Sequence, residues 1–277
     1  MSANSGYWFS KNPDKAWAEK FFLGFIPVFF AYNALVQGMG WLDVGNFWHV
    51  TQNLLMWIPY CLLLPLWLRR TSGVAWHHSY WFKFNVYMAV YVFFATYFHT
   101  EYFFEVLGMR YRFPEVTLYL DSNLLGPNEA TALMEAKKIP LGMYFNAIAF
   151  FVVYHTAAVV CMRRVRTMTH GLGAGARWLS WVVIVAVTAL FFAWAETFFY
   201  ITGAATDNVW YEDLRAMLMV GSLCYALYFV VSFPNIYRMD EDGNTWTVSR
   251  SIIEAGFVSM LSLLLLDAFA WINGPII

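Results

Sequence analysis

Several long apolar stretches of this sequence contain acidic or histidine side chains, although a charge within a membrane is costly. Residues of this kind usually face the interior of a helix bundle, where they bind ligands or transfer protons. Carboxyl and imidazole groups in a site shielded from water are suited to general acid–base catalysis. The candidates are His99, Glu101, Glu105, His155, Glu196, Glu254 and Asp267.

Glu196 is the first candidate for a catalytic acid or base. It lies in the segment Trp194–Phe198, and its apolar stretch contains no basic residue. The alternative is a structural hydrogen bond to a neighbouring helix. His155, between Tyr154 and Thr156, has the same two interpretations: it orients a ligand, or it bridges two helices.

Glu101 and Glu105 are four residues apart, so they share one face of a helix and could share a proton. Glu105 lies near the end of its stretch, where the simpler interpretation is a side chain that reaches the membrane surface. His99 points about 200° away from Glu101 at about 100° per residue, so both face one centre only if the helix is distorted. Asp267 is either catalytic or structural, for example paired with an Arg, and Glu254 is expected near the membrane surface.

The composition predicts the elements that carry these residues. Of 277 residues, 60% are hydrophobic and 13% are charged, whereas soluble domains have about 25% charged residues. A membrane-spanning helix needs about 20 apolar residues. We therefore predict an all-α, polytopic transmembrane helical bundle of about seven spans, in a single domain of residues 1–277. The predicted spans are 21–40, 53–68, 84–107, 141–162, 178–201, 216–236 and 252–272.

Some of these elements have special features. Asn12 and Pro13 form a helix start that should lead straight into the first span, and Pro59 and Pro65 predict a kink or a re-entrant segment in the second. The longest loop, 108–140, should contain a helix over Asn128–Lys138. This loop is either a lid over a cavity or a solvated addition.

The basic residues predict the orientation. Twelve of the 17 Lys and Arg residues fall on the side that holds the N-terminus, which we call side A, and five fall on the opposite side B. Side A should therefore be cytoplasmic, in a bacterial inner membrane or the endoplasmic reticulum. At uniform helical rise, one layer about two-thirds to three-quarters of the way towards side B contains His99, Glu101, Glu196 and Asp267.

Several classes of function lack their usual signatures. The net charge of -1 provides no basic surface for nucleic acid. The sequence has no phosphate-binding loop, no GxSxG and no HExxH motif, and its six histidines do not form the boxes of membrane di-iron enzymes. Inverted repeats typical of many transporters are not evident either. Acid–base chemistry on an apolar substrate remains, with no metal or other cofactor expected.

The order and spacing of several segments resemble the cycloeucalenol cycloisomerase family, the cyclopropyl sterol isomerases of plant sterol synthesis. The resemblance covers nearly the whole chain. The matching segments are Trp8–Phe22, Tyr97–Pro114, Tyr154-His155, Arg163-Arg164, Glu196-Thr197, Tyr225–Pro234, Arg238–Glu241, Ser249-Arg250, Asp267 and Gly274–Ile276. Plant members differ by Trp in place of His99 and His in place of Glu101, and this chain has extra residues between 115 and 139.

The resemblance implies an intramolecular lyase that opens the 9,19-cyclopropane ring of a cycloeucalenol-type sterol to give an 8-ene product. The partners would be a sterol from the bilayer and membrane lipids, and the oligomeric state is not indicated. Two alternatives stay open: another sterol or triterpenoid double-bond isomerase, or a non-enzymatic protein that binds or transports lipids. The resemblance implies catalytic roles for Glu196, His155 and Asp267, and substrate-binding roles for Thr100, Tyr102, Tyr225 and Tyr228. Glu101 and His99 differ from the family pattern and are catalytic candidates because they are ionisable residues within a span.

Overall fold

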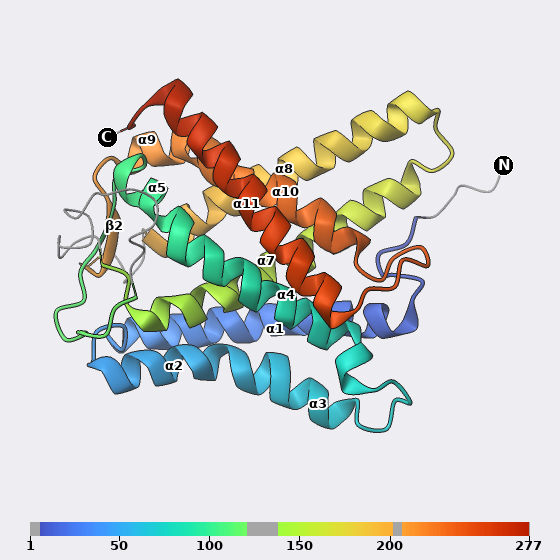
Figure 1. The fold of residues 1–277 in the computed structure, drawn as a ribbon, viewed down its shortest axis with the longest axis horizontal. Coiled ribbons are helices and arrows are strands. Elements are labelled where there is room, and N and C mark those ends of the chain that lie inside the picture. Colours follow the sequence, from blue (N-terminus) through green and yellow to red (C-terminus); the bar gives the residue numbers. More distant parts are fainter. Residues whose placement is uncertain (1–5, 121–137, 202–206, 277) are drawn as a thin grey trace.

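The computed structural model describes residues 6–120, 138–201 and 207–276, and it shows a bundle of long helices (Figure 1). Within these residues, six helical segments are long and apolar enough to cross a membrane. The all-α, polytopic prediction is confirmed. The six are α1 (Pro13–Gly38), α2–η1–α3 (Asn46–Ile58, Pro59–Leu63, Leu64–Leu68), α7 (Leu141–Met168), α8 (Ala174–Ile201), α9–η6–α10 (Leu214–Ala216, Met217–Gly221, Ser222–Arg238) and α11 (Val248–Asn273).

The third predicted span is also a continuous helix. It consists of α4 (Tyr80–Phe94), the π-helix η3 (Ala95–His99) and α5 (Thr100–Glu105), and a short 3-10 helix η2 (Trp76–His78) precedes it. At about 1.5 Å per residue its length is roughly 39 Å, enough to cross a bilayer. It begins where the backbone nitrogen of Tyr80 donates to Asp14, 2.6 Å away. Its other end leads into strand β1 (Met109–Tyr111), so it runs the full length of the bundle.

The helix boundaries follow local chemistry. Asn12 caps α1, because its side chain accepts hydrogen bonds from the backbone nitrogens of Asp14 and Lys15, and Pro13 is the first helical residue. The predicted N-terminal segment and first span therefore form one helix. The second span begins at Asn46 and is a continuous helical segment to Leu68. The predicted irregularity at Pro59 is a π-helical turn.

Helix α7 occupies the centre of the bundle. In its most apolar window 78% of the residues are buried, against 28–56% in the other five candidate spans of the described chain. It packs against α1, α2, α4, α8 and α10. Large apolar side chains on the surrounding helices face outward instead; Phe199 is 65% exposed, Ile253 70% and Trp271 87%. Such an apolar exterior is typical of a surface covered by lipid.

A buried ionic network joins the helices at side A. Arg163 of α7 is fully buried and contacts Glu19 of α1 at 2.6 Å and Glu241 of the α10–α11 loop at 2.8 Å. Lys15 also contacts Glu241, at 3.0 Å. Burial raises the pKa of Glu241, but hydrogen bonds from Arg163 and the charge of Lys15 outweigh this effect and hold that pKa below its ordinary value. The network fixes three distant segments against one another.

Side B carries a small sheet that the all-α prediction did not include. Strand β1 pairs antiparallel with β2 (Val209–Tyr211). The backbone nitrogen of Ile276 donates to the carbonyl of Val106, so the C-terminal segment lies at side B, opposite the α1 start. This agrees with an odd number of spans. The cytoplasmic orientation of side A stays a prediction, and the predicted helix over Asn128–Lys138 lies outside the described residues, apart from Lys138 itself.

Candidate active site

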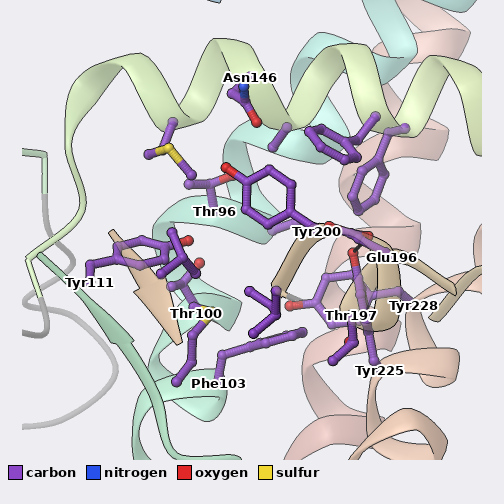
Figure 2. A pocket seen from close by; sticks show the side chains of 18 of the residues that line it. Thr96, Thr100, Phe103, Tyr111, Asn146, Glu196, Thr197, Tyr200, Tyr225 and Tyr228 are labelled. Atoms are coloured by element: carbon purple, nitrogen blue, oxygen red, sulfur yellow. Dashed lines mark hydrogen bonds between the residues drawn. The ribbon is translucent and has the colours of Figure 1, made fainter. Parts of the chain in front are cut away.

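A cavity of about 110 Å³ lies between four of the helical spans, and the two strands line it towards side B. We call it the inner cavity (Figure 2). In the strands, alternate side chains face it because residues two apart share a face of a sheet. Its walls contain Ala95, Thr96, Thr100, Phe103, Met109, Tyr111, Met143, Asn146, Ala147, Phe150, Phe151, Glu196, Thr197, Tyr200, Ile201, Val209, Tyr211, Tyr225 and Tyr228.

Glu196 of α8 lines this cavity and is half-buried. The Tyr225 hydroxyl of α10 donates a hydrogen bond to its Oε2, and the Tyr154 hydroxyl of α7 makes a second hydrogen bond to the carboxyl group. Among the described residues, no Lys or Arg forms an ion pair with Glu196. A carboxyl group held in this way is positioned for proton transfer, because no permanent cation fixes its charge.

The π-helix η3 shapes the wall that the third span contributes. Such π-helical turns are rare and are frequent at functional sites. Ala95, Thr96, Thr100 and Phe103 face the cavity, so this distortion places two hydroxyl groups on an otherwise apolar wall. Thr100, which was predicted to bind substrate, is one of these two residues.

Tyrosines form much of the remaining wall. The rings of Tyr225 and Tyr228 lie edge to face with 5.5 Å between centroids, and Phe103 packs against Tyr225 at 5.0 Å. In the strands, burial raises the pKa of Tyr211, and the nearby Glu196 adds to this effect. Tyr211 therefore stays protonated and can donate a hydrogen bond. Tyr225 and Tyr228, predicted to bind substrate, are both at the cavity.

Asn146 of α7 presents an acceptor to the cavity through a chain of hydrogen bonds from α2. Asn53 donates to the carbonyl of His49 at 2.7 Å, which leaves its amide oxygen to accept from Asn146 Nδ2, also at 2.7 Å. The Asn146 amide oxygen therefore points away from α2, towards the cavity (Figure 2). Close contact of α2 with α7 requires Gly142, since a Cβ there would lie 2.4 Å from the His49 ring.

The two histidine candidates lie behind the cavity wall. His99 is 1% exposed and packs edge to face on Tyr228, with 5.1 Å between the ring centroids. His155 is fully buried; its Nδ1 is 2.8 Å from the Phe151 carbonyl and its Nε2 is 2.8 Å from the Ser232 hydroxyl. Both nitrogens of His155 thus have partners, and the ring bridges α7 and α10.

The remaining candidates lie apart from the inner cavity. Tyr102 donates a hydrogen bond of 3.2 Å to Asp267, which is exposed on α11. Glu101 is half-buried and is not among the residues that line the cavity. The layer predicted from depth is therefore not a single cluster, because its members point in different directions around their helices. Across the described residues, no group of three or more His, Cys, Asp and Glu side chains is placed to hold a metal ion.

A second hollow, of about 430 Å³, lies between α1, α7 and α8. We call it the lateral groove. Three of its side chains, Phe30, Phe191 and Phe199, are more than half exposed, so it opens to the outside of the bundle. Phe150, Glu196 and Tyr200 line both the groove and the inner cavity. The complete lining is Ile26, Phe29, Phe30, Asn33, Ala34, Gln37, Phe150, Val153, Tyr154, Ala157, Phe191, Phe192, Ala195, Glu196, Phe199 and Tyr200.

Comparison with known proteins identifies a relative of this chain. The chain is 29% identical over 283 residues to cycloeucalenol cycloisomerase of Arabidopsis thaliana, and the match covers 100% of this chain and 92% of that protein. The chain is a distant relative of cycloeucalenol cycloisomerase. The resemblance inferred from the sequence segments is thereby confirmed. No protein-family model matches the chain, and no solved structure matches it.

Several residues that line the cavity were not among the site residues predicted from the sequence. Asn146 is polar within an apolar span, which was a usable signal. Tyr200 and Thr96 are residue types that are common in membrane helices, so the residue type alone does not indicate a site. Tyr111 and Tyr211 face the cavity only because β1 pairs with β2, and such a long-range pairing cannot be read from either short segment alone.

Proposed function

We propose that this protein is a membrane isomerase that opens the 9,19-cyclopropane ring of a 3-hydroxy sterol and forms an 8-ene product by general acid–base catalysis. The observation that carries the proposal is Glu196, which lines a cavity inside the bundle and is hydrogen-bonded by tyrosines instead of being ion-paired. The relative's name, cycloeucalenol cycloisomerase, supports the substrate class and the reaction.

The reaction requires one proton to arrive and one to leave. An acid protonates C19 while the C9–C19 bond breaks, so that its electron pair forms the new C–H bond and C9 becomes positive. A base then removes the proton from C8, and the electrons of that bond form the C8–C9 double bond. Glu196 is our candidate for one of these proton transfers, with Tyr225 and Tyr154 positioned to exchange protons with it. Nearby aromatic faces, such as those of Phe150 and Tyr200, would stabilise the cation.

Reaction of a cycloeucalenol-type sterol in D₂O tests this proposal. The purified protein in lipid nanodiscs should convert the sterol to an 8-ene product with one deuterium in the C19 methyl group. Mass spectrometry and NMR locate the label. Unchanged sterol, or a product without deuterium at C19, would contradict cyclopropane opening; a shifted double bond without this label would indicate the other kind of sterol isomerase.

A sterol-binding or transport protein is the second candidate, because the lateral groove is large, apolar and open to the outside of the bundle. Such a protein would bind a sterol but release it unchanged. The same incubation distinguishes the two functions, since bound sterol recovered without product would support binding alone.

A further inference from the structure

Neither hollow by itself suits both ends of a sterol. The inner cavity holds about 110 Å³, well below the roughly 300–1,000 Å³ of typical small-molecule pockets. The lateral groove, at about 430 Å³, is large enough but is mainly apolar. The two meet at Phe150, Glu196 and Tyr200. A sterol, which is rigid and has one polar end, would fill the inner cavity with that end and the lateral groove with the rest.

We infer that one sterol occupies both hollows, with its 3-hydroxyl end at Asn146 in the inner cavity, its ring system beside Glu196 and its alkyl tail in the lateral groove. This inference rests on the proposed function for the class of substrate. It assigns the hydroxyl to a specific acceptor and the entry route to the side of the bundle between α1 and α8. The carboxyl group then lies beside the middle of the ring system, where the cyclopropane is.

The inner cavity suits the hydroxyl end because of its polar wall. The Asn146 amide is held by Asn53 with its oxygen towards the cavity, so it accepts a hydrogen bond from a hydroxyl group. Thr96 and Thr100 lie on the same wall. The cavity is also small, at about 110 Å³, which fits a compact ring end better than a branched tail.

The boundary between the hollows can open by movement of one side chain. Phe150 and Tyr200 pack edge to face across it, with 5.4 Å between centroids. Within the described part of the chain, the buried Tyr200 hydroxyl has no hydrogen-bond partner. Packing alone therefore holds this ring, and rotation of Tyr200 would join the groove to the cavity. Changes of side-chain rotamer on binding are common.

The reverse orientation, with the hydroxyl in the groove, has its own candidate acceptor. Asn33 of α1 lines the groove, and its buried amide oxygen has no partner among the described residues. Asn33 and Asn146 are thus a matched pair for experiment, because both are buried amides on helices that face the proposed sterol.

Binding in nanodiscs tests the inference independently of turnover. The probes are a 3β-hydroxy cyclopropyl sterol and its 3-deoxy analogue. Asn146→Leu should weaken binding of the hydroxy sterol about 3- to 10-fold, as expected for one hydrogen bond, and should leave the deoxy analogue unaffected. Ala34→Trp, which fills the groove from an exposed position, should weaken both probes at least about 10-fold, whereas Ala268→Trp on the outer face of α11 should change neither.

The outcomes separate the possibilities. The proposed orientation would be wrong if Asn33→Leu, and not Asn146→Leu, weakened binding of the hydroxy sterol while leaving the deoxy analogue unaffected. Equal weakening of both probes by Asn146→Leu, normal binding by Ala34→Trp, or no sterol binding by the unmodified protein would also overturn the inference. The expected binding pattern without any turnover would leave the two-part site standing and would remove the proposed isomerase function.

Discussion

Replacing Arg163 by Ala tests whether the buried ionic network at side A holds the helices around the site. Arg163 contacts two carboxylates, those of Glu19 and Glu241, and its side chain is fully buried. In the variant, both carboxylates would lose their main cation. Lys15 would remain beside Glu241 at 3.0 Å, but one ammonium cannot replace both contacts.

The expected loss of stability is large. Removing one partner of a buried ion pair costs about 3–5 kcal/mol, because the remaining charge stays buried without compensation. For a chain of this size, 1 kcal/mol corresponds to about 2–4 °C in Tm. Arg163→Ala should therefore lower the apparent Tm by about 6–20 °C.

The control is Arg166→Ala, one turn further along α7. Arg166 is 48% exposed and lies 3.5 Å from Asp242, which is 65% exposed, and exposed pairs contribute about 0–1 kcal/mol. Thermal unfolding in one detergent, followed by circular dichroism, compares the two variants. Equal changes in Tm would refute the reasoning, because burial of the network would then have no energetic consequence.

Three further predictions concern the site, the packing and the network. Tyr225→Phe should lower the turnover rate about 10- to 150-fold through loss of its hydrogen bond to Glu196, with Tm nearly unchanged; normal turnover would exclude this role. Gly142→Ala should lower stability by about 1–3 kcal/mol, because the new Cβ would overlap His49, and an unchanged Tm would show that α2 can move away. Since the pKa of Glu241 is held below its ordinary value of 4.5, its contribution should be complete above that pH and lost as the pH falls through the folded-state pKa. Glu241→Gln should flatten the fall of Tm at acid pH, and an identical fall in both proteins would contradict this.

The spans could be predicted well because each depends on local composition and length. The fourth and fifth predicted spans, 141–162 and 178–201, correspond to Leu141–Met168 and Ala174–Ile201. The observed helices are longer at side A, since a helix continues beyond the apolar region when charged residues can reach the surface or each other. The first span shows the same effect, with Lys15 and Glu19 inside a helix that starts at Pro13.

The site was predicted only in part. Glu196, Thr100, Tyr225 and Tyr228 all line the inner cavity, because an acid in an apolar span and the family resemblance both pointed to this region. The position of a residue along a helix does not show which way its side chain points around the helix axis. His99 packs on the ring of Tyr228 and Asp267 is hydrogen-bonded to Tyr102, so neither side chain lines the cavity. The position of Asn146 depends on contacts between α2 and α7, which no single segment specifies.

Turnover by Glu196→Gln in lipid nanodiscs tests the central claim most directly. We expect the rate of 8-ene formation to fall about 10²- to 10⁴-fold, the usual contribution of a general acid or base, while the variant still binds the sterol. Glu254→Gln, which changes a carboxyl group bonded to Asn235 and Arg250 near side A, should retain the rate of the unmodified protein. A Glu196→Gln protein that forms product within a few-fold of the normal rate would contradict the account.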